Sequence, residues 1–134
     1  RMVPAVPLRP LMTQFMAGGI ALGVATNDAE MAARKQLEVA QIIDVFKYIA
    51  GYDSGHGAKP HPGMCTGFAR ALDLDPRACV MVGDSRHDLE AGRAAGMRVV
   101  AVLTGVARAA DLAPHADVVL PDIGALPAWI AAQT

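Results

Sequence analysis

The 134-residue sequence predicts an α/β fold with a doubly wound parallel sheet. Two observations support this prediction. Short apolar runs such as residues 20–25 and 98–103 contain no polar alternation, which is typical of strands covered on both faces. Segments with helical spacing alternate with these runs, which favours βαβ units with right-handed crossovers. The length is that of one domain, so we expect a single domain over residues 1–134.

The first part of the chain predicts a helix, a strand and a second helix. Five apolar residues fall at i, i+3, i+4, i+7 and i+8 and predict one helix face: Leu8, Leu11, Met12, Phe15 and Met16. The Gly pair at 18–19 ends this helix, and the apolar run 20–25 predicts a buried strand. Asn27 and Glu30 have the spacing of a capping box, so we expect the next helix to begin there and to reach about Gln41.

The middle of the chain predicts a weaker strand, a loop and another helix. The weaker strand spans residues 46–50, and the Gly/Pro-rich stretch 51–63 predicts a loop. An amphipathic helix follows, with its apolar residues at Met64, Phe68, Ala71 and Leu72.

The last part of the chain repeats the strand–helix alternation more clearly. Residues 78–82 predict a strand, and residues 88–95 a helix that Gly96 closes. Residues 98–103 predict another strand, which is apolar after its first residue. The remaining predicted elements are a short helix near 107–112, a strand at 117–120 and a C-terminal helix that contains Trp129 and Ile130.

Composition limits the function classes. A hydrophobic content of 53% is ample for a core, and a net charge of -1 offers no electrostatic reason to expect nucleic acid or an anionic membrane as a partner. Cys65 and Cys79 are too few for a disulfide framework, so we expect reduced, packed thiols. No apolar stretch approaches the roughly 20 residues that span a bilayer, and no signal-peptide pattern is present. These features predict a cytoplasmic protein.

Polar residues follow three of the predicted strands. Thr26 and Asn27 follow the strand at 20–25, where a hydroxyl and backbone amides at a helix start suit an anion such as phosphate. Lys59 lies in the loop after the strand at 46–50, and Asp84 and Asp88 follow the strand at 78–82. Ligands of open α/β sheets bind at the carboxyl ends of the strands, so we expect these side chains to form one site.

Each of these residues also has a purely structural interpretation. Thr26 or Asn27 could be a plain N-cap. Lys59 alone is most often a solvated lysine, Asp84 could cap the next helix, and the two histidines of the 51–63 loop are more often polar than metal ligands. The combination favours a functional site, because phosphoryl transfer needs a hydroxyl, a lysine and carboxylates that bind Mg²⁺.

Three stretches of the sequence resemble motifs of the haloacid dehalogenase-like hydrolases, most closely those of the phosphoglycolate-phosphatase-like branch. VATND at 24–28 is similar to the family's second motif, and AKPHPG at 58–63 to its third. VGDSRHDLEAGRAAGM at 82–97 is similar to the fourth motif and is long and specific. The resemblance extends from about Val6 to Ile130.

The resemblance implies a role for each residue that matches a motif. Thr26 would hydrogen-bond the phosphoryl group, and Lys59 would stabilise that group together with the nucleophile. Asp84 would be the direct Mg²⁺ ligand, and Asp88 would support the metal site from close by. Gly63 stands where the family commonly has Asp.

The family's first motif, which supplies the aspartate nucleophile, has no match in this sequence. The only Asp-x-Asp is at 73–75, before a strand instead of after one, and Asp53 lies in DSGHG, which does not match either. The family's cap domain is absent as well. By resemblance, the missing strand is the central one, between the strands at 20–25 and 78–82. We expect a gap of two strand spacings, roughly 9 to 10 Å, or direct pairing of these two strands.

Three hypotheses follow. The first is an Mg²⁺-dependent phosphatase of a small phosphorylated metabolite, with its N-terminal part missing from a chain that starts at Arg1; this chain alone would then be inactive. The second is a noncatalytic phosphate- or Mg²⁺-binding module that a partner chain or a second copy completes by strand exchange. The third is a phospho-receiver domain. In such domains the order along the chain is acid, hydroxyl, lysine, whereas here it is hydroxyl, lysine, acid, which disfavours this hypothesis.

Overall fold

The computed structural model describes residues 8–133, so Arg1 and Val6 lie outside it, as does the side chain of Leu8. Helices and strands alternate as predicted: α1 (Leu8–Ala17), β1 (Leu22–Ala25), α2 (Glu30–Val39), β2 (Phe46–Ala50), α3 (Gly63–Ala71), β3 (Val80–Gly83), α4 (Arg86–Ala94), β4 (Arg98–Val102), α5 (Ala109–Leu112), β5 (Val118–Leu120) and α6 (Leu126–Ala132). Short 3-10 turns lie at Ile43–Val45, Pro76–Ala78, Ala113–His115 and Ile123–Ala125. Within residues 8–133, no helix has both the length and the apolar character to cross a membrane.

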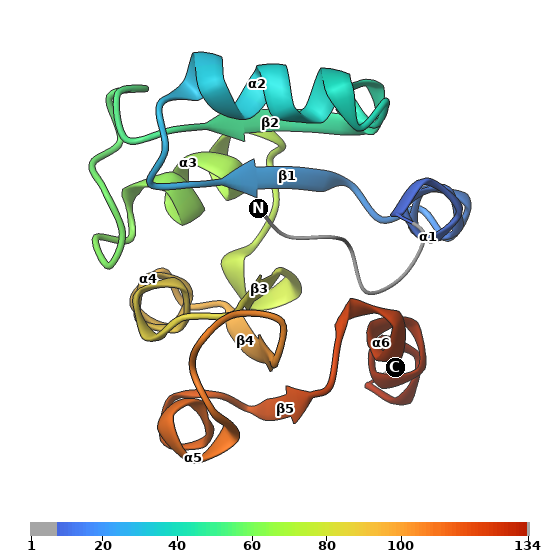
Figure 1. Cartoon of the computed structure of the whole chain (residues 1–134), viewed down its shortest axis with the longest axis vertical. Helices are drawn as coiled ribbons and strands as arrows, with labels where there is room; N and C mark the ends of the chain where they lie inside the picture. Colours follow the sequence, from blue (N-terminus) through green and yellow to red (C-terminus); the bar gives the residue numbers. More distant parts are fainter. Residues whose placement is uncertain (1–7, 134) are drawn as a thin grey trace.

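Every strand pairing in this part of the chain is parallel, which confirms the predicted fold class. β1 pairs with β2, and β4 lies between β3 and β5 in a second group. Figure 1 shows the β1–β2 pair above the β3–β4–β5 sheet, with α1 and α6 on one side and α4 and α5 on the other. The strands therefore form two separate parallel sheets with helices on both faces.

The two sheets do not pair with each other. Among residues 8–133 no ladder joins β1 to β3, so both strands border a gap. The predicted alternative of direct pairing is thus wrong: β1 and β3 stay unpaired, and the predicted width of the gap stays a prediction. The side chains of Val80, Met81 and Val82 on β3 are only partly buried, whereas Val99, Val100 and Ala101 on β4 are fully buried. The difference arises because β4 has a strand on each side and β3 has one on one side only.

Alternate residues of the strands pack into cores on opposite faces. One face packs with α1 and α6 through Leu22, Val80, Val82, Val100, Val118 and Leu120. The other face packs with α3, α4 and α5 through Met81, Val99, Ala101 and Val119. The first core contains residues of both sheets, and α1 contributes Leu11, Met12 and Phe15 to it. This two-sided burial is the reason that the strand segments read as continuous apolar runs.

The start of α2 differs from the prediction. The helix begins at Glu30, and its N-cap, Ala29, has no capping side chain, so the predicted capping box at Asn27 is wrong. The carboxylate of Asp53, from the loop after β2, instead accepts the backbone N–H of Glu30 at 2.9 Å. A distant residue thus satisfies the N–H group that a local cap would have bound.

The start of α4 also differs. The helix begins at Arg86, two positions before the predicted start at Asp88, because Ser85 is the N-cap. The Ser85 hydroxyl accepts the Asp88 N–H, and the Asp88 carboxylate accepts the Ser85 N–H at 3.3 Å, which is a complete capping box. Asp88 therefore lies in the first turn of the helix, where the helix dipole favours a negative charge.

Both cysteines are buried free thiols, as predicted. Burial raises the pKa of the Cys65 thiol to about 11, and burial also raises the pKa of Cys79. Reaction with a thiol reagent such as DTNB at pH 8 should therefore be about 100-fold slower in the native protein than in urea, where thiols have a pKa of about 8.5. Equal rates in both states would contradict the packed-thiol interpretation.

The raised pKa of Cys65 also predicts a pH dependence of stability. The protonated thiol contributes stability that is present below pH about 8.5 and is lost as the pH rises through about 11. Urea unfolding of the native protein and of Cys65→Ala over this range would detect the loss, which should be smaller in the variant.

Candidate functional site

An ion pair joins the two sides of the gap at the carboxyl ends of the strands. The Lys59 ammonium contacts the Asp88 carboxylate, and both side chains are nearly buried, with exposed fractions of 10% and 11%. The same Nζ donates to the backbone carbonyl of Ala25, the last residue of β1, at 2.8 Å. Lys59 therefore connects the end of β1 with the start of α4, although β1 and β3, the strand that leads into α4, belong to different sheets.

Asn27 holds the backbone of Lys59. Its Nδ2 donates to the Lys59 carbonyl at 3.0 Å, and its Oδ1 accepts the Lys59 N–H at 2.7 Å. The Lys59–Pro60 peptide bond that follows is cis. The Asn27 amide thus makes one contact with Lys59 at each end, and a contact of this residue with phosphate could use its backbone N–H or the second hydrogen of Nδ2.

Thr26 keeps a donor for a ligand. Its Oγ1 accepts the backbone N–H of Asp28 at 3.1 Å, and its own N–H donates to the carbonyl of Ala50 on β2 at 3.0 Å. A hydroxyl that accepts one hydrogen bond still has its own hydrogen to donate. The predicted contact of Thr26 with a phosphoryl oxygen is therefore chemically available.

Both carboxylate oxygens of Asp88 are in use. Oδ1 contacts Lys59, while Oδ2 accepts the backbone N–H groups of Asp84 and Ser85 at 3.2 and 3.3 Å. These contacts neutralise the charge of a nearly buried carboxylate and also order the turn that carries Asp84. Asp88 thus holds Lys59 and the turn that carries Asp84, and its predicted support of a metal site stays a prediction.

The Asp84 carboxylate, in contrast, has no hydrogen bond or ion pair with any of residues 8–133. It is partly exposed and lies against Gly105, in the loop after β4. Hard carboxylate oxygens suit Mg²⁺, which commonly takes one or two of them and fills its remaining positions with water or phosphate. Asp84 fits such an ion, although no group of three or more metal-binding side chains exists among the described residues.

Sequence reasoning overlooked two contributors to this site. One is the Ala25 carbonyl, which carries no side-chain signal at all. The other is Gly105, whose signal was its place after the apolar run 98–103, at the edge where ligands of such sheets bind.

The structure also explains the departure at Gly63, the first residue of α3. A Cβ added there would lie 1.8 Å from the carbonyl oxygen of His56. The Gly63 N–H donates to Nδ1 of His61 at 3.0 Å. The backbone of the loop therefore occupies the space that a side chain at position 63 would need.

The Asp-x-Asp at 73–75 lies at the opposite end of β3 from this site. Asp75 caps the 3-10 turn before β3, and its carboxylate pairs with Arg77. It precedes β3, whereas Asp84 and Asp88 follow that strand. This placement agrees with the prediction that it cannot replace the missing motif.

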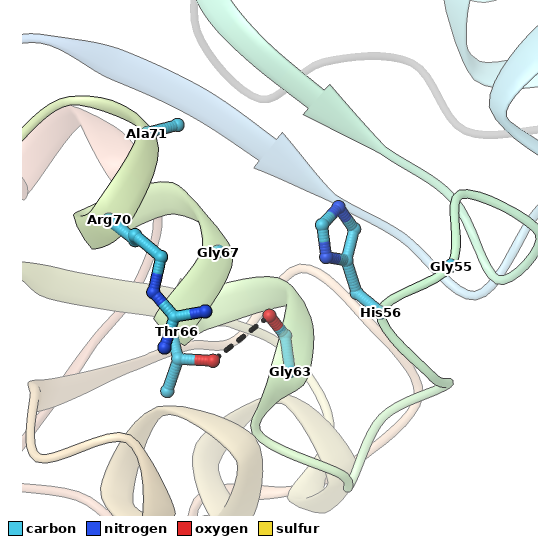
Figure 2. Close-up of a pocket in the computed structure, with 7 residues that line it drawn as sticks. All are labelled: Gly55, His56, Gly63, Thr66, Gly67, Arg70 and Ala71. Carbon is cyan, nitrogen blue, oxygen red and sulfur yellow. Dashed lines mark hydrogen bonds between the residues drawn. The ribbon is translucent and has the colours of Figure 1, made fainter.

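A separate pocket of about 380 Å³ lies beside α3, and none of the predicted site residues lines it. Figure 2 shows the Arg70 side chain extending toward Thr66 on the helix, with the His56 ring across from them on the loop. His56 packs on the ring of Tyr48, with 5.9 Å between ring centroids. The pocket is therefore distinct in its lining from the group around Lys59.

Comparison with known proteins gives a consistent result. Residues 6–102 match the model of the haloacid dehalogenase-like hydrolase family. The phosphoglycolate phosphatase of Neisseria meningitidis is 40% identical over 111 residues, which are 81% of this chain and 47% of that protein. The chain thus spans about half the length of this relative and of the phosphoglycolate phosphatase of Neisseria gonorrhoeae.

Solved structures share the fold. A haloacid dehalogenase-like hydrolase of Streptococcus pneumoniae superposes with a TM-score of 0.80 at 20% identity, over 93% of this chain and 59% of that one. The β-phosphoglucomutase of Clostridium difficile has a TM-score of 0.76 at 24% identity, over 92% of this chain and 52% of that one. At such identities these structures support the fold alone. Because the family match covers most of the chain, this protein belongs to the haloacid dehalogenase-like hydrolases.

Proposed function

We propose that the protein containing this chain hydrolyses a small phosphate monoester, similar to phosphoglycolate, by Mg²⁺-dependent phosphoryl transfer. The observation that carries this proposal is the grouping of Thr26, Lys59, Asp84 and Asp88 at the carboxyl ends of β1 and β3, beside the gap between the sheets. Phosphoryl transfer needs positioning and charge stabilisation, and these side chains offer a donor, a cation and a free carboxylate.

Each residue has a distinct part in this mechanism. The Thr26 hydroxyl would donate to a phosphoryl oxygen, and the Lys59 ammonium would balance the charge that develops on the phosphoryl group. Asp88 holds the Lys59 ammonium next to the end of β1, and Asn27 holds the Lys59 backbone in place. Asp84 would hold Mg²⁺, which when bound shields the charge of the phosphoryl oxygens.

The nucleophile of the proposed reaction is an aspartate outside this chain. By resemblance to the family, it would follow the central strand, which would lie between β1 and β3. Both strands have an unpaired edge facing that position in the described part of the chain. A strand from an upstream segment or from a partner chain would fit between them and would bring its carboxyl end close to Lys59 and Asp84.

A noncatalytic role is the second candidate, and one observation favours it. The Lys59 ammonium contacts the Asp88 carboxylate and the Ala25 carbonyl, so its charge is already balanced within the chain. In this version the chain binds phosphate or Mg²⁺ and relies on a partner for a strand. The two candidates share the metal ligand and differ in the nucleophile.

A phosphatase assay distinguishes them. We expect no turnover of p-nitrophenyl phosphate by the 134-residue chain, and Mg²⁺-dependent turnover by a version that includes the natural upstream coding sequence. Asp84→Asn in the longer version should abolish most of that turnover, because a neutral amide is a poorer ligand for a hard ion. Activity of the short chain that survives repurification and disappears with Asp84→Asn would contradict the role of an upstream nucleophile. A longer version without activity on phosphate monoesters would favour the noncatalytic candidate.

The proposed substrate class rests on the similarity to known proteins. The similarity to the phosphoglycolate phosphatase of N. meningitidis supports a small phosphorylated acid, and an assay with phosphoglycolate beside other phosphate monoesters would test it. The cytoplasmic location expected from the sequence stays a prediction.

A further inference from the structure

The loop that follows β4 touches the free carboxylate of Asp84. A Cβ added to Gly105 would lie 2.8 Å from Cγ and 2.9 Å from Oδ2 of Asp84, and 3.1 Å from its Cβ. Contacts below 3.0 Å force a neighbour to shift. The bare backbone of Gly105 is therefore the surface on which this carboxylate rests.

Space, not backbone conformation, is the reason for glycine at this position. Gly55 and Gly57 have positive φ angles of 93° and 87°, in the left-handed region that other residues rarely adopt. Gly105 does not have such an angle, so its backbone would accept alanine. An alanine there would act through its methyl group alone, and the first atoms it meets belong to Asp84.

The topology brings the two residues together. β3 and β4 are paired neighbours, with Gly83 opposite Ala101. Asp84 directly follows Gly83, and Gly105 lies in the loop that leaves β4 at the same edge of the sheet. No hydrogen bond or ion pair within residues 8–133 holds the Asp84 carboxylate, so packing is what limits its position.

We infer that Gly105 is a positioning residue for Asp84: its lack of a side chain lets the carboxylate take the position in which it binds a divalent cation. This inference rests on the proposed function, since it assumes that Asp84 is the Mg²⁺ ligand. Groups that orient a metal ligand commonly change metal affinity by about 10- to 100-fold when they are altered.

The test is an Mg²⁺ titration of the full chain, followed by the NMR shifts of the backbone amides at 83–88. We expect Gly105→Ala to raise the Kd for Mg²⁺ about tenfold. The matched control is Gly18→Ala, where an added Cβ would lie 3.5 Å from its nearest neighbour, an ordinary contact, and where φ is not in the left-handed region. The control should leave the Kd unchanged.

A double-mutant cycle separates positioning from general damage to the fold. If Gly105 acts through the carboxylate, Gly105→Ala should add nothing to the affinity loss in an Asp84→Ala background. Thermal unfolding of each variant reports whether the chain stays folded. If Gly105→Ala alone prevents folding, Asp84→Ala should restore folding to it, because Cγ and Oδ2, the nearest atoms to the added methyl group, are then gone. A double variant that also fails to fold would contradict the inference.

The outcomes are distinguishable. An unchanged Kd in Asp84→Asn would contradict the proposed metal ligand itself. A weaker Kd in Asp84→Asn together with an unchanged Kd in Gly105→Ala would overturn the inference and leave the proposed function standing. Equal losses for Gly105→Ala with and without the Asp84 carboxylate would also overturn the inference.

Discussion

Replacing Lys59 by methionine is expected to lower the free energy of unfolding by about 3 kcal/mol. The variant would leave the Asp88 carboxylate, only 11% exposed, without its cation, and it would also leave the Ala25 carbonyl without its donor. Exposed ion pairs contribute less than about 1 kcal/mol to stability, but breaking one that is nearly buried leaves an unpaired charge in the interior. Urea unfolding, followed by circular dichroism, measures the difference.

The matched control also removes the negative charge of Asp88. In the double variant Lys59→Met, Asp88→Asn, no charge is left buried, and the amide introduced at position 88 keeps an oxygen for the N–H groups of Asp84 and Ser85. We therefore expect the double variant to be more stable than Lys59→Met alone. A loss below about 1 kcal/mol in Lys59→Met would mean that water screens the pair as it does on a surface.

This stability effect changes how the catalytic role of Lys59 must be measured. The sequence alone suggested either a solvated loop lysine or, by resemblance, a lysine that stabilises the phosphoryl group. The structure adds a structural role, so activity in a longer version of the protein has to be compared at a temperature where Lys59→Met is still folded. A loss of turnover by the folded variant at that temperature would show that Lys59 stabilises the phosphoryl group.

Replacing Gly51 by alanine is expected to cost about 3 kcal/mol of stability. An added Cβ would lie 2.3 Å from the Glu30 nitrogen and 2.5 Å from the Asp28 carbonyl oxygen. These are backbone atoms, which cannot rotate away as a flexible side chain can. The same Asp28 carbonyl, in the turn that follows β1, also accepts the N–H of Tyr52. The clash would therefore disturb the connection between β1 and α2, which carries Thr26.

Gly18→Ala is again the control, since its added Cβ would make only an ordinary contact. We expect it to change the midpoint of urea unfolding little, whereas Gly51→Ala should lower it strongly. In Gly51→Ala the amide resonances of residues 26–30 should move as well. A Gly51→Ala variant as stable as Gly18→Ala would contradict the close packing of this turn against the end of β2.

The fold was largely predictable because the strand signal is local. A strand buried on both faces needs apolar residues throughout, so the runs at 20–25 and 98–103 indicated parallel strands without reference to the rest of the chain. The helix starts were less predictable. Asn27 has the spacing of a cap, but Asp53 supplies the partner from the next loop. Only the folded chain brings that carboxylate to the N–H of Glu30.

The sequence by itself determined the α/β class, the residues at the carboxyl ends of the strands and the absence of a matching nucleophile motif. These depend on residue type and order along the chain. The tertiary structure alone decided that β1 and β3 stay apart, that Lys59 joins β1 to α4 through Asp88, and that Asp84 rests on Gly105 without a partner among residues 8–133. Such contacts join residues far apart in the sequence, and their distances depend on how the helices and strands pack. No local pattern encodes them.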